Sequence, residues 1–279
     1  MRLIPIVLGL LSIFSTAHAR KITYIAHRGE AMDAPEGSLP SYKLAMDRHL
    51  SGVKLDVQYS KDKVVVMSHD VTLQRMTGTD LKISETTYAD MKEKATYKTV
   101  GGYAKEKIVT LDEALAVVKD CPLLFIDFKF FSDEIAKDVF ARLEKFCIPR
   151  SHVIVANFNY KALARIKELF PNVRTVAHIS YKKEQDGTYW IFGKGYKDKA
   201  DLAKAIVELK NKIDLFGVNI CAIPEIADKE FISTLQKNGL WISIWFVNEP
   251  EQALYYSTNG ADAFVTDCGG RMREVVEGK

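Results

Sequence analysis

Short runs of Ile, Val, Leu and Phe alternate along the chain with segments whose apolar residues recur at helical spacing. The short runs occupy eight stretches: 22–26, 53–57, 123–128, 152–157, 174–179, 215–220, 241–247 and 263–266. Runs of this length between helical segments are typical of buried strands in a parallel sheet. Eight such units in a chain of this length predict an α/β fold, the (β/α)8 TIM barrel.

Capping residues mark the starts of several helices between these strands. Ser38, Thr110 and Asn159 are predicted N-cap residues, and Pro250 suits a first helical turn. The corresponding helices are predicted to end at residues 50, 118, 170 and 257. Each helix therefore follows a predicted strand or a long connection, as a barrel requires.

Two connections are longer than the loops of α/β units ordinarily are. About fifty residues lie between Ser60 and Thr110, including a short strand pattern at 64–67, and they predict a small insertion after the second strand. The stretch 182–197 places three aromatic residues among Gly and Lys. It fits either a lip over the barrel mouth or a solvated loop whose aromatic rings pack onto the barrel.

The first nineteen residues have the pattern of a secretory signal peptide. Arg2 precedes an apolar run from residue 3 to 14, and Ala-His-Ala at 17–19 is a small-x-small cleavage site. Residues 1–19 are therefore predicted to be removed on export to the periplasm or the medium, leaving a barrel domain at 20–279. The apolar run is shorter than the roughly 20 residues of a membrane span, so no stable span is expected after cleavage.

Charge and cysteine content narrow the class of protein. Removing 19 of the 279 residues leaves 260, and the loss of Arg2 lowers the formal net charge from +3 to +2. This balance gives no reason to expect a nucleic-acid partner. Cys121 and Cys147 should both lie at the N-terminal rim of a barrel, where they could form a disulfide or remain thiols, and nothing fixes a bond between Cys221 and Cys268.

Polar residues stand at the carboxyl ends of the predicted strands, where the active site of a TIM barrel lies. They are His27, Asp56, Asp127, Lys129, Asn219 and Asp267, and His69 follows the extra strand of the insertion. One neutral and one protonated imidazole can act as general base and general acid. With Arg28 and Lys54 supplying positive charge, His27 and His69 predict acid–base chemistry on a phosphate ester.

The segment from residue 24 to 70 also carries a family resemblance. It contains His-Arg-Gly at 27–29, Pro-Glu at 35–36, Ser-Lys-Asp at 60–62 and His-Asp at 69–70. In this order the motifs resemble the glycerophosphodiester phosphodiesterase family of PLC-like phosphodiesterase TIM barrels. The strand FIDFK at 125–129 and the C-terminal segment from 245 to 267 resemble the family too, so the resemblance covers the whole chain after the predicted signal peptide.

The resemblance implies roles for individual residues. His27 and His69 are the implied acid–base pair. Arg28 and Lys129 would hold the phosphate, with Glu36 supporting Arg28. Asp70 is the carboxylate beside His69, and Trp245 would contact the alcohol group of the substrate or belong to the barrel core. In the family a divalent cation, Ca²⁺ or Mg²⁺, is bound by acids that correspond to Asp56, Asp127 and one further position. Asp267 is expected to close and cap the barrel.

That further position is occupied by Lys54. Lys54 and Asp56 are two residues apart on a strand and therefore point to the same face. Three carboxylates and one divalent cation have a net charge of −1, and so do two carboxylates and one ammonium. We therefore expect the Lys54 ammonium to occupy the place of the cation, between Asp56 and Asp127, because an ammonium both removes a metal ligand and repels the ion.

The sequence thus predicts an exported phosphoric diester hydrolase that cleaves glycerophosphodiesters or related small phosphodiesters by two-histidine catalysis, without a metal if Lys54 replaces it. Three alternatives stay open. Attack by a neighbouring hydroxyl of the substrate would make a cyclic phosphate, as in a lyase. A non-catalytic phosphodiester-binding or polyol-binding protein could keep the same fold. A barrel that acts on sugars through Asp56 and Asp127 fits poorly beside two histidines and three cations.

Overall fold

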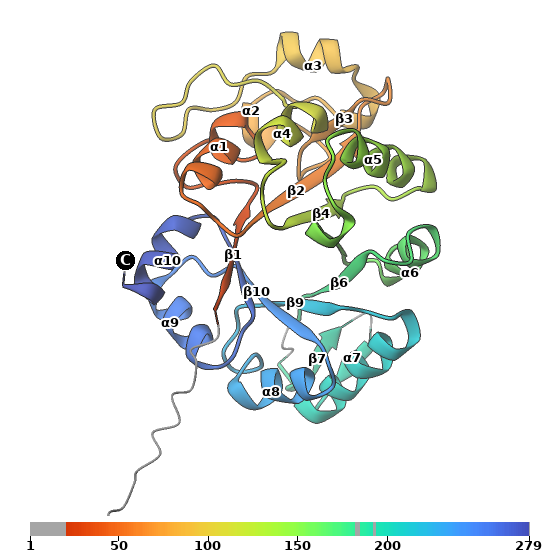
Figure 1. Ribbon diagram of the computed structural model, residues 1–279, viewed down its shortest axis with the longest axis vertical. Coiled ribbons are helices and arrows are strands. Elements are labelled where there is room, and N and C mark those ends of the chain that lie inside the picture. Colours follow the sequence, from red (N-terminus) through yellow and green to blue (C-terminus); the bar gives the residue numbers. More distant parts are fainter. Residues whose placement is uncertain (1–20, 182–184, 192–193, 279) are drawn as a thin grey trace, which may run out of the picture.

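A computed structural model describes residues 21–181, 185–191 and 194–278, and it contains the predicted barrel. Figure 1 shows the strands at the centre of the molecule with helices arranged around them. All eight predicted strands are present, with ends within two residues of the predicted ones. Residues 1–20, and with them the predicted signal peptide, lie outside the described residues.

The barrel consists of eight parallel strands. They are β1 (Thr23–His27), β2 (Gly52–Tyr59), β4 (Leu124–Phe128), β5 (Val153–Asn157), β6 (Arg174–Ile179), β9 (Gly217–Cys221), β10 (Trp241–Trp245) and β11 (Ala263–Thr266). Neighbours pair in the order β1-β2-β4-β5-β6-β9-β10-β11, and β11 pairs with β1. This last pairing closes the sheet, so the carboxyl ends of all eight strands surround one mouth.

Side chains alternate between the two faces of each strand, and this alternation sorts the residues of β2 and β4. Val53 and Leu55 belong to the large core between the strands and the helices. Lys54 and Asp56 therefore point into the barrel, as Asp127 does on β4. Below them the interior is filled by a second, smaller core: Ile25, Leu123, Phe125, Ile154, Ala156, Val176, Ala263 and Val265. The polar residues form a layer above this core, nearest the mouth.

The helices cover the outside of the barrel. They are α1 (Leu39–Asp47), α4 (Leu111–Val118), α5 (Asp133–Lys145), α6 (Tyr160–Leu169), α7 (Lys199–Ile213), α8 (Lys229–Lys237), α9 (Pro250–Thr258) and α10 (Gly269–Glu277), with a 3₁₀ turn η2 (Arg150–His152) before β5. The predicted N-caps at Ser38, Thr110 and Asn159 are confirmed. The first helix ends three residues earlier than predicted, because His49 adopts a left-handed φ of +52°.

The predicted insertion after β2 is confirmed as a small ordered layer. It contains β3 (Val65–Met67), α2 (Gln74–Thr77), η1 (Ile83–Glu85) and α3 (Tyr88–Lys94) and lies beyond α1 and α4 at the top of Figure 1. Leu73, Ile83, Met91 and Ile108 are buried in a hydrophobic cluster of its own. The insertion is therefore held in place by apolar packing and can position side chains over the barrel mouth.

The other long connection contains a two-stranded hairpin, β7 (Tyr189–Ile191) and β8 (Lys194–Tyr196). Tyr189 packs against the main core, as the second interpretation of this stretch expects, whereas Trp190 is exposed, and a lip over the mouth stays a prediction. Residues 182–184 and 192–193 lie outside the described residues.

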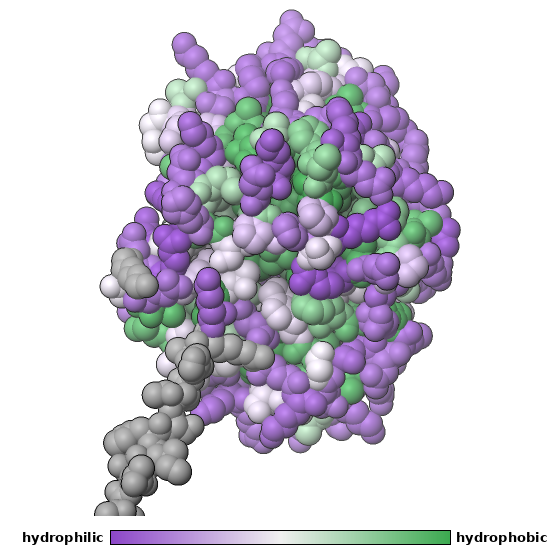
Figure 2. All heavy atoms as spheres, in the orientation of Figure 1, coloured by the Kyte–Doolittle hydropathy of each residue, from purple (hydrophilic) through white to green (hydrophobic). Residues whose placement is uncertain are grey.

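The surface of the molecule agrees with a chain of balanced charge. Figure 2 shows hydrophilic side chains over most of the face in view, with smaller hydrophobic patches between them. No helix in the described ranges is long and apolar enough to span a membrane.

All four cysteines are free. The disulfide considered for Cys121 and Cys147 does not form, because Cys121 is buried and its thiol donates to Leu123 O, whereas Cys147 is exposed.

Candidate active site

His27 ends β1 inside the barrel mouth. Its Nδ1 lies 2.7 Å from Oδ1 of Asp267, and its ring packs against Phe246 with 4.3 Å between the ring centroids. The side chain is only 4% exposed. Burial lowers the pKa of His27 to about 4, although the bond to Asp267 acts in the opposite direction. His27 is therefore neutral at neutral pH, with its Nε2 left for a ligand.

These contacts give Asp267 a role that was not predicted. Its carboxylate binds His27 and accepts a 2.7 Å hydrogen bond from Asn248 Nδ2, and it makes no cap on α10. Glu30 takes the capping position instead, since its carboxylate accepts hydrogen bonds from the N–H groups of Gly269 and Gly270. A carboxylate at a helix N-terminus is favourable because the free N–H groups there carry partial positive charge. Asp267 is thus available to orient His27.

The residue after His27 turns sharply toward β2. Arg28 has φ +61° and Gly29 has φ +82°, and a Cβ on Gly29 would lie 2.4 Å from Ser41 Oγ. Only glycine fits such a position against α1. The turn directs the guanidinium of Arg28 to Glu36 at 2.7 Å and to Asp56 at 3.2 Å. The predicted support of Arg28 by Glu36 is present.

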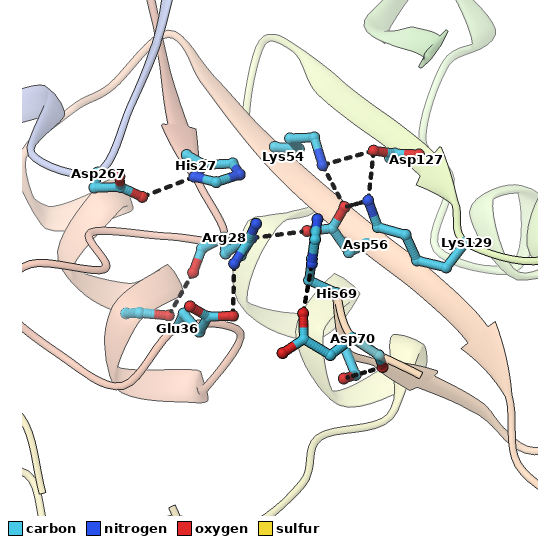
Figure 3. A network of polar contacts seen from close by, with 12 residues as sticks. His27, Arg28, Glu36, Lys54, Asp56, His69, Asp70, Asp127, Lys129 and Asp267 are labelled. Atoms are coloured by element: carbon cyan, nitrogen blue, oxygen red, sulfur yellow. Dashed lines mark hydrogen bonds and ion pairs between the residues drawn. The ribbon is translucent and has the colours of Figure 1, made fainter. Parts of the chain in front are cut away.

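Lys54 lies between the two strand carboxylates, as the sequence predicts (Figure 3). Its Nζ contacts Oδ1 of Asp56 and lies 2.8 Å from Oδ2 of Asp127. Lys129 reaches the same two oxygens, at 2.9 and 2.8 Å. An ammonium has three N–H groups, so the contacts in the described part of the chain leave each lysine one donor for a ligand.

The charges in this cluster stabilise one another. Burial by itself would raise the pKa of Asp56, but the ammoniums of Lys54 and Lys129 hold it below its usual value. Burial would likewise raise the pKa of Asp127, but Lys54 and a hydrogen bond from His178 hold it low. Burial would lower the pKa of Lys129, but the two carboxylates raise it. Both acids are therefore ionised, and with Arg28 the cluster has three cations and two anions.

His69 reaches the mouth because β2 extends beyond its neighbours and β3 returns antiparallel to it. Val57 pairs with Met67, and the N–H of Ser68 donates to Asp56 O, so the next residue lies at the level of Asp56. The imidazole is 38% exposed, and its Nδ1 lies 2.7 Å from Oδ1 of Asp70. Burial and the ammonium of Lys129 lower its pKa. The predicted pairing of Asp70 with His69 is present.

Arg75 of the insertion binds the carboxylates beside His69 and Arg28, and this residue was not predicted. Its Nε donates to Asp70 at 2.6 Å, and its terminal nitrogens donate to both oxygens of Glu36. It thereby links the carboxylate beside His69 to the one beside Arg28. No local pattern marks Arg75, because its partners are reached only through the packing of the insertion.

A buried chain of polar groups lies on the far side of Asp127, and of its members only Asn219 was singled out from the sequence. His178 Nε2 lies 3.2 Å from Asp127 Oδ2, and Asn219 Nδ2 lies 3.0 Å from His178 Nδ1. Ser243 Oγ donates to Asn219 Oδ1 at 2.7 Å. The amide fixes the tautomer in which His178 donates to Asp127. Strand alternation could have identified His178, since it is the inward-facing residue near the end of β6.

Two adjoining cavities share His69. One is lined by His27, Lys54, Asp127, Lys129, His178 and Trp245 among others, and the other by Arg28, Glu36 and Asp56 among others. Trp245 lies at the first cavity, its indole N–H donates to Asn219 O, and its ring contacts Phe158. Trp245 is therefore part of the barrel wall at this cavity, and its contact with the substrate stays a prediction. All predicted site residues lie at one mouth.

The donor set at this mouth does not fit a divalent cation. Ca²⁺ and Mg²⁺ take about six or more oxygen ligands. Here Asp56 and Asp127, the two predicted metal ligands, direct oxygens to the ammoniums of Lys54 and Lys129. Within 21–181, 185–191 and 194–278, no group of three or more His, Cys, Asp or Glu side chains could hold a metal ion. A cation between these carboxylates would have to displace Lys54.

Comparison with known proteins gives concordant matches along the barrel. The model of the glycerophosphoryl diester phosphodiesterase family matches residues 27–270, a range that includes both histidines. Glycerophosphodiester phosphodiesterase 1 of Bos taurus is 26% identical over 265 residues, which cover 88% of this chain and 78% of that protein. The structure of glycerophosphodiester phosphodiesterase from Thermotoga maritima is 25% identical with a TM-score of 0.70, covering 92% of this chain and 100% of that one.

A phosphodiesterase from Oleispira antarctica, solved in complex with the product sn-glycerol-3-phosphate, has a TM-score of 0.73 at 24% identity. The similarity covers 91% of this chain and 96% of that one. The two chains therefore share the barrel fold over nearly their whole lengths.

Proposed function

Because the chain belongs to the glycerophosphoryl diester phosphodiesterase family and is a phosphoric diester hydrolase, we propose that it hydrolyses glycerophosphodiesters without a divalent cation. The position of Lys54 carries this proposal. Its ammonium lies between the carboxylates of Asp56 and Asp127, where the family resemblance places the metal. Glycerophosphodiesters are favoured as substrates because the Oleispira antarctica enzyme binds sn-glycerol-3-phosphate as product.

The phosphodiester anion binds to the three cations of the cluster. Arg28, Lys54 and Lys129 outnumber Asp56 and Asp127 by one charge, which matches the single negative charge of a phosphodiester. The guanidinium can hold two phosphate oxygens in its planar fork, and each lysine offers its remaining N–H. In a largely dry site these charges also stabilise the additional charge of the transition state.

His27 acts as the general base. Its Nδ1–H is held by Asp267, so the neutral Nε2 takes a proton from water while the water oxygen forms a bond to phosphorus. Asp267 then stabilises the imidazolium that results. Burial favours this direction of transfer, because it keeps His27 unprotonated before the reaction.

His69 acts as the general acid. As the bond between phosphorus and the leaving oxygen breaks, the protonated imidazole gives its proton to that oxygen, and the products are a phosphomonoester and an alcohol. The partial exposure of His69 and its bond to Asp70 suit this role. Burial and Lys129 lower the pKa of His69 in the free enzyme, and the bound phosphodiester anion raises it again.

The pH dependence follows from these two environments. We expect kcat/KM to fall below about pH 4, where His27 becomes protonated. On the alkaline side kcat/KM should fall with a midpoint below pH 6.5, because the pKa of His69 is lowered by burial and by Lys129. The alkaline limb of kcat should lie at higher pH than that of kcat/KM, because the bound anion raises the pKa of His69. Initial rates between about pH 3.5 and 9 would measure both profiles, and an acid limb above about pH 6 would contradict a role for His27 with the low pKa that its burial produces.

A phosphodiesterase assay with and without chelator tests the proposed function. We expect hydrolysis of sn-glycero-3-phosphocholine at the same rate after dialysis against excess EDTA. Phosphorus NMR should show a phosphomonoester, whereas a cyclic phosphate would indicate attack by the substrate's own hydroxyl. Complete loss on chelation, restored by Ca²⁺ or Mg²⁺, would reject the metal-free site. His27→Ala protein prepared in parallel controls for contaminating activity.

A non-catalytic binding protein is disfavoured, because both histidines and the full set of charged residues are kept together at the mouth. It would be indicated if binding of the phosphodiester occurred without turnover and were unaffected by His27→Ala.

Export stays a prediction from residues 1–19, and N-terminal sequencing of the secreted protein would show whether it begins at Arg20.

A further inference from the structure

His178 faces the barrel mouth but takes no part in the proton transfers proposed for His27 and His69. It is buried on β6 and lines the same cavity as those two histidines. Both of its ring nitrogens are engaged, since Nε2 lies 3.2 Å from Asp127 Oδ2 and Nδ1 lies 3.0 Å from Asn219 Nδ2. The ring therefore has no nitrogen to offer a substrate, and an effect of His178 on the reaction has to pass through Asp127.

Three neighbouring strands hold this imidazole at one level of the barrel. The register pairs His178 of β6 with Asn219 of β9, and Asn219 with Ser243 of β10. The Ser243 hydroxyl donates to Asn219 Oδ1, which directs the amide nitrogen to the imidazole. All three side chains are buried. This chain of hydrogen bonds is therefore built from paired strands and does not depend on a loop.

The imidazole is also fixed by packing, and it reaches across β5. Its ring centroid lies 4.9 Å from that of Phe158 and 6.1 Å from that of Phe125. Between β6 and β4 lies β5, whose inward-facing residue opposite Asp127 is Ala156. The small methyl group of Ala156 leaves the space across which His178 meets Asp127.

The carboxylate of Asp127 carries both lysines of the phosphate site. The Nζ atoms of Lys54 and Lys129 each lie 2.8 Å from Oδ2 of Asp127, the same oxygen that His178 contacts. A divalent cation would fix its carboxylate ligands by short coordinate bonds, whereas a lysine ammonium sits on a flexible stem and holds a carboxylate only by hydrogen bonds. The bond from the barrel wall then sets the orientation of the carboxylate, and with it the direction of the two ammoniums.

We infer that His178 is a positioning residue for the hydrolysis, because it holds Asp127 in the orientation in which Lys54 and Lys129 direct N–H groups to the phosphate. The inference rests on the proposed function, since His178 takes over the fixing of a carboxylate that a divalent cation would otherwise hold. His178 transfers no proton in this role. An amide donor at the same place should therefore serve nearly as well as the imidazole.

Two substitutions separate the hydrogen bond from the volume of the side chain. His178→Leu fills similar space without a donor, so kcat on sn-glycero-3-phosphocholine in EDTA should fall by about 10 to 100-fold, the usual effect of losing a supporting partner at such a site. KM should change little, because all three cations that bind the phosphate are retained. His178→Gln keeps an N–H donor and should recover most of kcat. Thr175→Val, a buried exchange of similar size on the opposite face of β6, is the matched control and should leave kcat unchanged.

A double substitution identifies the residue through which His178 acts. Once Asp127→Ala has removed the acceptor, adding His178→Leu should lower kcat no further, because two residues that act through one contact are not additive. Asn219→Leu should cause a smaller loss than His178→Leu, because the imidazole can still reach Asp127. Thermal unfolding checks that each variant is folded, and the comparison of His178→Leu with His178→Gln decides the question even if the Asp127→Ala protein does not fold.

Equal losses in His178→Leu and His178→Gln would overturn the inference, because they would assign His178 to proton transfer or to packing. Full activity of His178→Leu, or a further loss when it is added to Asp127→Ala, would also overturn it. In each of these cases hydrolysis by the unsubstituted enzyme in EDTA would leave the proposed function intact. If that enzyme required Ca²⁺ or Mg²⁺, the metal-free site would be rejected and this inference with it.

Discussion

His27→Ala and His69→Ala are each expected to lower kcat on a glycerophosphodiester by about 10² to 10⁴-fold, the usual contribution of a positioned acid or base. This corresponds to roughly 3–5 kcal/mol of transition-state stabilisation. KM should change little, because the phosphate is held by Arg28, Lys54 and Lys129 rather than by either imidazole. Steady-state kinetics of the two purified variants measure the effect.

A substrate with a more acidic leaving alcohol distinguishes the two roles. Its leaving oxygen needs less protonation, so an aryl phosphodiester should recover much of the loss in His69→Ala but little of the loss in His27→Ala. His152→Ala is the matched control, because His152 lies in η2 before β5, at the opposite end of the barrel. A loss below about tenfold in either site variant, or a comparable loss in His152→Ala, would be incompatible with the two-histidine mechanism.

Lys54→Glu is expected to make the enzyme dependent on a divalent cation. Three carboxylates would then face two cations, Arg28 and Lys129, so the site would repel the phosphodiester. Activity without metal should fall by about 10² to 10³-fold, the usual effect of removing one preorganised group from a transition state. Ca²⁺ or Mg²⁺ should restore a large part of it, because the introduced carboxylate would join Asp56 and Asp127 as an oxygen ligand. Titration of kcat/KM with each metal measures this.

Lys54→Met is the control for this exchange. It removes the charge at similar length and supplies no ligand, so its activity should fall without any response to metal. Breaking a buried ion pair costs roughly 3–5 kcal/mol, and thermal unfolding of both variants, with and without Ca²⁺, therefore checks that they are folded. Metal stimulation of the unsubstituted enzyme, or full activity of Lys54→Met, would contradict the assignment of Lys54.

Local patterns in the sequence predicted the barrel and one side of its active site. Strand ends were predicted within two residues, because buried strands and amphipathic helices have short-range periodicities. The position of Lys54 followed from its spacing to Asp56, since residues two apart on a strand share a face. The left-handed turn at Arg28 and Gly29 was not predicted, although a glycine there is a local signal for it.

Several contacts between distant segments were not predicted. Arg75 joins Asp70 to Glu36 through the packing of the insertion, and Asp267 orients His27 across 240 residues of sequence. His178 is inward-facing by strand parity, but its partner Asp127 depends on side chains that meet across the barrel. Such partners have no signature in the residues beside them.

The sequence by itself therefore determined the kind of barrel and the position of Lys54 on the same face as Asp56, because each depends on residue type and on spacing within one strand. Only the tertiary structure decided which carboxylate supports His27 and how Arg75 joins Asp70 to Glu36. Those features arise when the sheet closes and the insertion packs, since closure brings together side chains that are separated by most of the chain.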